Sequence, residues 1–206
     1  LSIPVPTLTR RRPQRTTMCP AEMAWNPALP VSIRLLPIHT RKEAASIAHW
    51  RMRPEAWVTF TFNPDEPDGM AQSINKVSEV QRVSVEEAIK LGFWLADGPN
   101  GERNPDNPAP DRLGQVEVPV WRHACINIPH PLLQQGLVIL DTPGLNAIGV
   151  EPDLTMALLG QAQATLFILG ADTGVTKSDL DLWREHLSHA AAAHIPRYAI
   201  LNKIDT

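Results

Sequence analysis

The last third of the chain contains three short apolar runs that do not alternate with polar residues, at residues 137–140, 164–169 and 198–201. Strands that are buried on both faces have this pattern. We expect helices in the stretches between the runs, at about 152–160 and 178–190. A strand–helix–strand–helix–strand order is typical of right-handed crossovers, so it predicts an α/β fold with a mostly parallel sheet flanked by helices.

Earlier segments alternate apolar and polar positions, which predicts strands with one wetter face. These segments are Val31/Ile33/Leu35, Val58/Phe60/Phe62 and Val116/Val118/Val120.

Helices are expected where proline is absent, between Asp68 and Gly98 and between Asp153 and Ile195, because proline removes a donor and clashes inside a helix. The Ser-x-x-Glu spacing of residues 84–87 is that of a capping box, which predicts a helix that begins there. Residues 40–43 have the same form, and residues 176–179 have a weaker version of it.

Composition narrows the class of protein. The chain has 206 residues, 43% of them hydrophobic and 20% charged, which is normal for a globular protein and excludes a disordered tail or a collagen-like chain. A net charge of −3 gives no general attraction to nucleic acid. Cys19 and Cys125 are too few for a disulfide scaffold and indicate a reducing compartment. No apolar run approaches the roughly 20 residues of a membrane-spanning helix.

The two ends of the chain favour a piece of a larger domain over a whole one. The sequence begins on Leu1 rather than Met and ends at Thr206, immediately after an Asn-Lys-Ile-Asp motif. We therefore expect the domain to be truncated at both ends.

A first candidate site follows the apolar run 137–140, where the chain reads Asp141-Thr142-Pro143-Gly144. An aspartate at the end of a buried strand can hold a Mg²⁺-bound water, and a following glycine lets a backbone N–H approach a terminal phosphate. The alternative is a strand followed by a Pro-Gly turn without a ligand.

A second candidate site is Asn202-Lys203-Ile204-Asp205, directly after the apolar run 198–201. A carboxylate at Asp205 can accept from both N1–H and the exocyclic amine of guanine, a donor pair that adenine does not offer. Asn202 can reach the base edge, and the stem of Lys203 can cover the ring. In this order and context the two motifs predict a GTP site.

The two motifs and their surroundings resemble the third and fourth motifs of dynamin-superfamily GTPases, in particular the bacterial dynamin-like proteins. The similar stretches are LDTPGLNAIGVEPDLT, LFILGADTGVTKSDLDLW and LNKID. The resemblance is close over residues 127–206 and loose over 1–40. It implies a partial GTPase domain of the P-loop type over residues 1–206, in which residues 41–113 are a family-type insertion with a flexible loop near 98–112.

The same resemblance assigns roles to individual residues. Thr17 is implied as the switch threonine, which completes the Mg²⁺ shell and places the attacking water, with Thr16 as the alternative. Asp141 is implied as the other residue that serves the metal, and Gly144 as the sensor of the γ-phosphate. The nucleotide-binding residues implied are Asp141, Thr142, Pro143, Gly144, Asn202, Lys203 and Asp205.

The activity implied is hydrolysis of GTP to GDP and phosphate with Mg²⁺, coupled to self-assembly and membrane remodelling. The resemblance also implies a homodimer through paired GTPase domains, in a cytoplasmic protein that associates peripherally with the inner face of a membrane. Direct nucleic-acid binding is not expected.

One departure from the family is the phosphate-binding loop GxxxxGK[ST], which is absent because none of the five lysines follows a glycine. The fifth motif, expected after Asp205, is also missing. We therefore expect hydrolysis in the intact protein and not by these residues alone. The alternative functions are a non-catalytic GTP-binding scaffold and a GTP-dependent switch associated with the chromosome or with replication.

Histidine and cysteine clusters do not predict a metal site. His123, Cys125 and His130 lack a completing set of ligands, and we expect Cys125 to pack as a small hydrophobic residue. The arginine-rich segment at residues 10–15 is expected to be a solvated loop.

Overall fold

The computed structural model describes residues 19–141, 149, 162–171, 174–175, 180, 183–184 and 196–204. The chain forms two compact units, residues 1–150 and 151–206. We describe each unit by itself.

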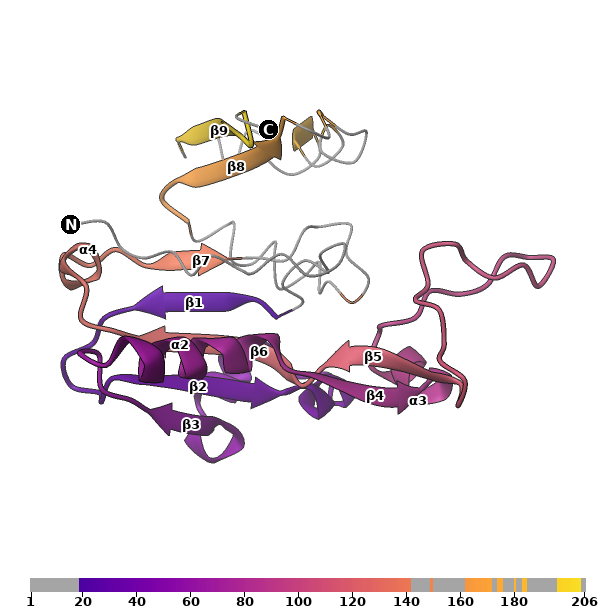
Figure 1. Ribbon diagram of the computed structural model, residues 1–206, viewed down its shortest axis with the longest axis horizontal. Helices are drawn as coiled ribbons and strands as arrows, with labels where there is room; N and C mark the ends of the chain where they lie inside the picture. The colour runs from indigo at the N-terminus through magenta and orange to yellow at the C-terminus, as the bar shows by residue number, and fades with distance from the viewer. Residues whose placement is uncertain are drawn as a thin grey trace. The chain divides into compact units, whose positions relative to one another are not determined.

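The first unit is organised around a five-stranded mixed sheet with the order β3-β2-β6-β1-β7 (Figure 1). β1 and β6 are parallel, whereas the other three neighbouring pairs are antiparallel. The strands are β1 (Ala21–Ala24), β2 (Ser32–Pro37), β3 (Val58–Thr61), β6 (Trp121–Asn127) and β7 (Ile139–Asp141).

One face of this sheet carries the main hydrophobic core. Ile33 and Leu35 of β2 and Ala124 and Ile126 of β6 are at most 5% exposed, and Val77 packs with them. Figure 1 shows helix α2 (Pro67–Asn75) lying across this part of the sheet. The 3₁₀ turn η3 (Lys76–Ser78) continues from it.

On the other face of the sheet, Trp57 and Arg51 contact side chains of the strands. Trp57 meets His123 of β6 edge to face, with ring centroids 6.2 Å apart. The guanidinium of Arg34, from β2, lies 5.7 Å from the centre of the Trp57 ring. The short elements between β2 and β3 in the chain are η1 (Ile38–Lys42), α1 (Ile47–Arg51) and η2 (Pro54–Ala56).

A second, smaller sheet in the first unit pairs β4 (Val80–Ser84) with β5 (Gln115–Pro119) in antiparallel fashion. Helix α3 (Val85–Lys90) follows β4 and closes a second core of six buried residues. Helix α4 (Pro131–Gln134) lies between β6 and β7. None of the described helices is both long and apolar enough to cross a bilayer.

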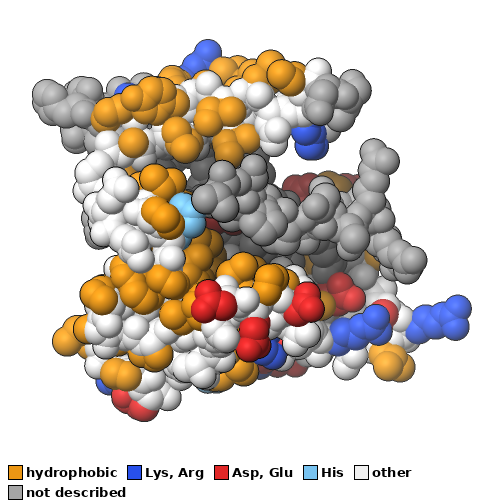
Figure 2. Space-filling view, turned by 60° about the vertical axis from the view of Figure 1, so that its left-hand side comes forward, with side chains coloured by type: hydrophobic (Ala, Val, Ile, Leu, Met, Phe, Trp, Pro, Cys, Tyr) orange, Lys and Arg blue, Asp and Glu red, His pale blue; other side chains and the backbone are white. Residues whose placement is uncertain are grey.

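In the second unit the described strands are β8 (Thr165–Gly170) and β9 (Arg197–Asn202), which pair in parallel. Leu166 and Ile168 of β8 are 60% and 62% exposed. Tyr198, Ile200 and Leu201 of β9 are exposed as well. Orange side chains at the top of Figure 2 mark this apolar surface.

The structure confirms several of the predicted elements. The three alternating segments form β2, β3 and β5, and the non-alternating runs contribute to β7, β8 and β9. The predicted helix start at Ser84 is also confirmed, because Ser84 Oγ accepts from Glu87 N at 3.2 Å at the start of α3.

The predicted helix start at Thr40 is wrong. The Thr40 hydroxyl donates backwards to the Pro37 carbonyl at 2.7 Å, inside the 3₁₀ turn η1. The helix begins at Ile47 instead, where Ser46 Oγ accepts from His49 N at 3.2 Å. The expected helices at 152–160 and 178–190 and the box at 176–179 lie almost entirely outside the described residues.

The prediction of a mixture of helices and strands is confirmed, whereas the mostly parallel sheet is not. Four of the six strand pairings among the described residues are antiparallel. Three of the four include a strand with an alternating pattern, namely β2, β3 or β5, as expected for strands with one wetter face. The fourth pairs β1 with β7. The prediction that the last three apolar runs are buried on both faces is also wrong, because Ile139, Leu166 and Leu201 are 46%, 60% and 58% exposed. Each of the strands β7, β8 and β9 has a single neighbour among the described strands.

Candidate functional site

Asp141 is the last residue of β7 and pairs with Ala21 of β1. Its side chain reaches the surface, and partial desolvation by nearby protein atoms raises the pKa of its carboxyl. A nearby cation would oppose this shift, because positive charge favours the ionised carboxylate. An oxygen ligand of this kind suits Mg²⁺.

Five of the expected site residues lie outside the described part of the chain, namely Thr17, Thr142, Pro143, Gly144 and Asp205. Their expected roles remain predictions.

Asn202 is the last residue of β9 and lies opposite Gly170, the last residue of β8. At this edge the residue after β8 bonds to the end of β9, because Ala171 N donates to Asn202 O at 2.8 Å. A second backbone bond, from Gly174 N to Gly170 O at 3.0 Å, closes the turn that follows β8. Because the two strands are parallel, their carboxyl ends meet at one edge. Ligands bind at such edges in open α/β sheets.

Lys203 has a backbone conformation that is uncommon for a residue other than glycine. Its φ is 57°, in the left-handed region. Its backbone N–H donates to the side-chain Oδ1 of Asn202 at 2.9 Å. The strand therefore ends abruptly at this pair, and both residues are exposed at its carboxyl end. Unfavourable backbone conformations of this kind concentrate at binding sites.

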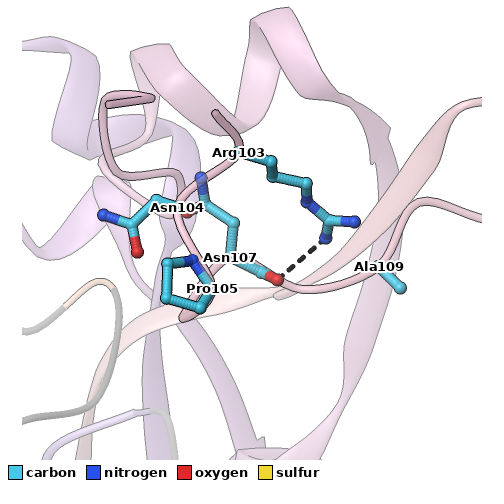
Figure 3. Close-up of a pocket in the computed structure, with 5 residues that line it drawn as sticks. All are labelled: Arg103, Asn104, Pro105, Asn107 and Ala109. Carbon is cyan, nitrogen blue, oxygen red and sulfur yellow. Dashed lines mark hydrogen bonds between the residues drawn. The ribbon is translucent and has the colours of Figure 1, made fainter. Parts of the chain in front are cut away.

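A shallow pocket of about 280 Å³ lies in the loop between α3 and β5 (Figure 3). Arg103 lines it and donates to the Asn107 carbonyl at 2.8 Å, as the dashed line shows. The Asn107 side chain in turn exchanges two hydrogen bonds with the Leu95 backbone, at 2.7 and 2.8 Å. These polar groups bond to the loop itself, so the pocket is explained by loop packing.

The sequence did not predict the group formed by Glu22, His123 and Cys125. One potential ligand atom from each residue lies within 4.8 Å of the other two. Burial raises the pKa of the Cys125 thiol to about 11, and the negative charge of Glu22 adds to the effect. Cys125 is half-buried and lies beside two other potential ligands. The sequence contained part of this signal, because the His-x-Cys spacing places both side chains on one face of a strand, but it did not indicate Glu22 as a third ligand.

Comparison of the chain with protein-family models, with curated proteins and with solved structures gives no match in any of the three.

Proposed function

We propose that the chain is part of a GTP-hydrolysing domain of the dynamin type. Asn202, Lys203 and Asp205 select guanine, and Asp141 serves Mg²⁺ together with Thr17. The observation that carries this proposal is the position of Asn202 and Lys203 at the carboxyl end of a parallel strand pair.

The base-selecting part of the proposal rests on donor and acceptor chemistry. The ionised carboxylate of Asp205 accepts from the two adjacent donors of guanine, and adenine cannot make this pair of bonds. The side-chain amide of Asn202 offers a donor as well as an acceptor, and its Oδ1 already accepts from Lys203 N at 2.9 Å. The apolar stem of Lys203 lies over the base, while its ammonium group stays in water.

The phosphate side of the proposal rests on Asp141 and the residues that follow it. Mg²⁺ neutralises charge on the phosphate oxygens when it is bound. The carboxylate of Asp141 would hold a water of the metal shell, and the hydroxyl of Thr17 would supply a second oxygen. The backbone N–H of Gly144 would donate to the terminal phosphate, so this segment would distinguish GTP from GDP.

The fold that accompanies this function is a nucleotide-binding α/β domain of the P-loop type. The parallel pairings β1–β6 and β8–β9 support it. The proposed activity includes self-assembly through paired GTPase domains and peripheral association with a membrane.

The experiment that tests base selection is a titration of the ¹⁵N-labelled 206-residue chain with GDP and, separately, with ADP. The amide resonances of Asn202 and Lys203 should shift at lower concentrations of GDP than of ADP. Resonances of the Arg103 loop serve as an internal control and should respond to neither nucleotide. Equal responses of Asn202 and Lys203 to the two nucleotides would overturn the proposal.

Hydrolysis is measured separately from binding, as phosphate release from GTP in the presence of Mg²⁺. Turnover is measured in the intact protein, because it is not expected from the 206-residue chain alone. A guanine preference without turnover in the intact protein supports the scaffold alternative. Co-sedimentation with anionic lipid vesicles and with DNA distinguishes membrane association from association with the chromosome.

A further inference from the structure

We propose that Glu22, His123 and Cys125 form a binding site for a transition-metal ion of the Zn²⁺ class. The three side chains come from two adjacent strands of the five-stranded sheet, β1 and β6. The site is independent of the proposed nucleotide site.

Strand register places the three side chains on one face of the sheet. Glu22 pairs with Cys125 in the parallel β1–β6 ladder. His123 lies two residues before Cys125 on β6, and side chains two positions apart in a strand point to the same face. This is the face that Trp57 and Arg51 contact, at His123 and Glu22. The alternate residues Ala124 and Ile126 fill the core on the opposite face.

The distances between the three ligand atoms are only slightly longer than those in a metal-bound site. The three ligand atoms lie within 4.8 Å of one another. Bonds from a tetrahedral zinc ion to N, O and S ligands require separations between ligand atoms of about 3.4–3.8 Å. Side-chain torsions of Glu22 and Cys125, which are both partly exposed, can supply this contraction. His123 is fully buried, at 0% exposure, so its imidazole is the fixed member of the group.

The ligand types select the class of ion. Thiolate and imidazole ligands favour Zn²⁺ and its neighbours among the transition metals, whereas Mg²⁺ and Ca²⁺ prefer sites made of oxygen ligands only. Three protein ligands leave a fourth position for water or another ligand.

Two arginines place positive charge next to the site. Arg51 forms an ion pair with Glu22, and Arg34 is the β2 neighbour of Cys125. In the metal-free site the Cys125 thiol keeps its proton. Binding a divalent ion with release of that proton changes the combined charge at Glu22 and Cys125, the ion included, from −1 to 0, and Arg51 and Arg34 favour the thiolate. Because a carboxylate has two oxygens, Glu22 can accept from Arg51 and also bind a metal ion.

The site is distinct from the Mg²⁺ position proposed at Asp141. Glu22 is the β1 partner of Leu140, and Ala21 is the partner of Asp141. Because side chains alternate along a strand, Asp141 and Glu22 point to opposite faces of the sheet.

The test is a titration of the metal-free 206-residue chain with Co²⁺, which reports its ligands through visible and near-ultraviolet absorption. We expect saturation at one ion per chain, with a thiolate-to-cobalt charge-transfer band that Zn²⁺ abolishes by displacing the cobalt. In the zinc form, X-ray absorption should show one sulfur ligand at about 2.3 Å. A wild-type chain without this band would overturn the proposal.

Matched variants identify the ligands. Cys125→Ser should remove the charge-transfer band, and Cys19→Ala, which removes the other thiol, should retain it. Glu22→Gln should weaken Co²⁺ binding at least tenfold. Circular dichroism of each metal-free variant establishes that it is folded, and Glu22→Gln keeps the test valid if Cys125→Ser does not fold. A band that persists in folded Cys125→Ser, or unchanged affinity in Glu22→Gln, would contradict the assignment.

Discussion

Phe93 packs directly against Gly149, five residues after the Asp-Thr-Pro-Gly motif. A Cβ atom built on Gly149 would come within 2.7 Å of Phe93 Cζ, and it would come closer to other atoms of the ring. Arg41 completes the contact, because it donates from Nη1 to the Gly149 carbonyl at 2.8 Å and its guanidinium lies 4.7 Å from the centre of the Phe93 ring. Two residues from the 41–113 stretch therefore anchor the chain just beyond the proposed phosphate-binding segment.

Gly149→Ala should be destabilising for two reasons. The backbone φ of 85° is unfavourable for alanine, and the added methyl group overlaps the Phe93 ring. Together these effects should lower the free energy of unfolding by about 2–4 kcal/mol, measured by urea denaturation. Gly101→Ala is the matched control, because Gly101 also has a positive φ of 76° but nothing within 4 Å of an added Cβ. Equal losses in the two variants would show that the Phe93 contact does not form.

Arg122 should contribute to stability through buried hydrogen bonds. It is 7% exposed and donates to the carbonyls of Thr40 at 3.0 Å and Ala45 at 3.1 Å. Arg122→Met leaves these two acceptors without their charged donor and should cost about 2–3 kcal/mol. The exposed Arg112→Met should change the free energy of unfolding by less than about 0.5 kcal/mol. A loss at Arg122 as small as that at Arg112 would contradict the buried arrangement.

The sequence predicted the strand ends that carry the candidate motifs better than it predicted the centre of the sheet. The run 198–201 was expected to end directly before Asn202, and β9 ends one residue later, at Asn202. By contrast, the central strand β6 was missed, because its inner positions include Arg122 and His123 as well as apolar residues. Their burial depends on tertiary partners such as the Thr40 carbonyl, which a local pattern does not contain.

The proposed metal site could not be predicted for a related reason. His123 and Cys125 are separated from Glu22 by about a hundred residues in the sequence, and the parallel register of β1 and β6 brings them together. A strand register between distant segments depends on the whole sheet, so the spacing of His123 and Cys125 alone gave no third ligand.

Cys19 should make stability depend on pH in the alkaline range. Burial raises the pKa of its thiol to about 12, with a smaller contribution from Cys125. The folded state therefore holds this proton more tightly than the unfolded state, whose thiol titrates near pH 8.5. The stabilisation is fully present below that pH and is lost as the pH rises towards 12.

The measurement for Cys19 is urea denaturation between pH 7 and the highest pH at which unfolding stays reversible. Wild type should lose stability above about pH 8.5, and Cys19→Ala should lose less over the same range. Parallel curves for the two proteins would show that Cys19 is not buried as described. Alkylation by iodoacetamide at neutral pH should also be slow in the folded chain and fast in urea, because the thiolate is the reactive form.

Substitutions of Lys203 separate its backbone conformation from its side chain. Its φ of 57° is unfavourable for any residue with a Cβ, so Lys203→Gly should be more stable than Lys203→Ala by about 1 kcal/mol in urea denaturation. Both variants lose the stem that is proposed to cover the base, so they should weaken GDP binding to a similar extent. If Lys203→Gly is no more stable than Lys203→Ala, the left-handed conformation is not populated in solution.

The base preference of Asp205→Asn tests the proposed function most directly. An asparagine amide can donate to the C2 carbonyl of xanthine, where the wild-type carboxylate accepts from the amine of guanine. Titration of the chain with GDP and with xanthosine diphosphate should show a preference for guanine in wild type and for xanthine in Asp205→Asn. The exposed Asp65→Asn is the control and should keep the preference for guanine. An unchanged preference in Asp205→Asn would contradict the assignment of this motif to guanine recognition.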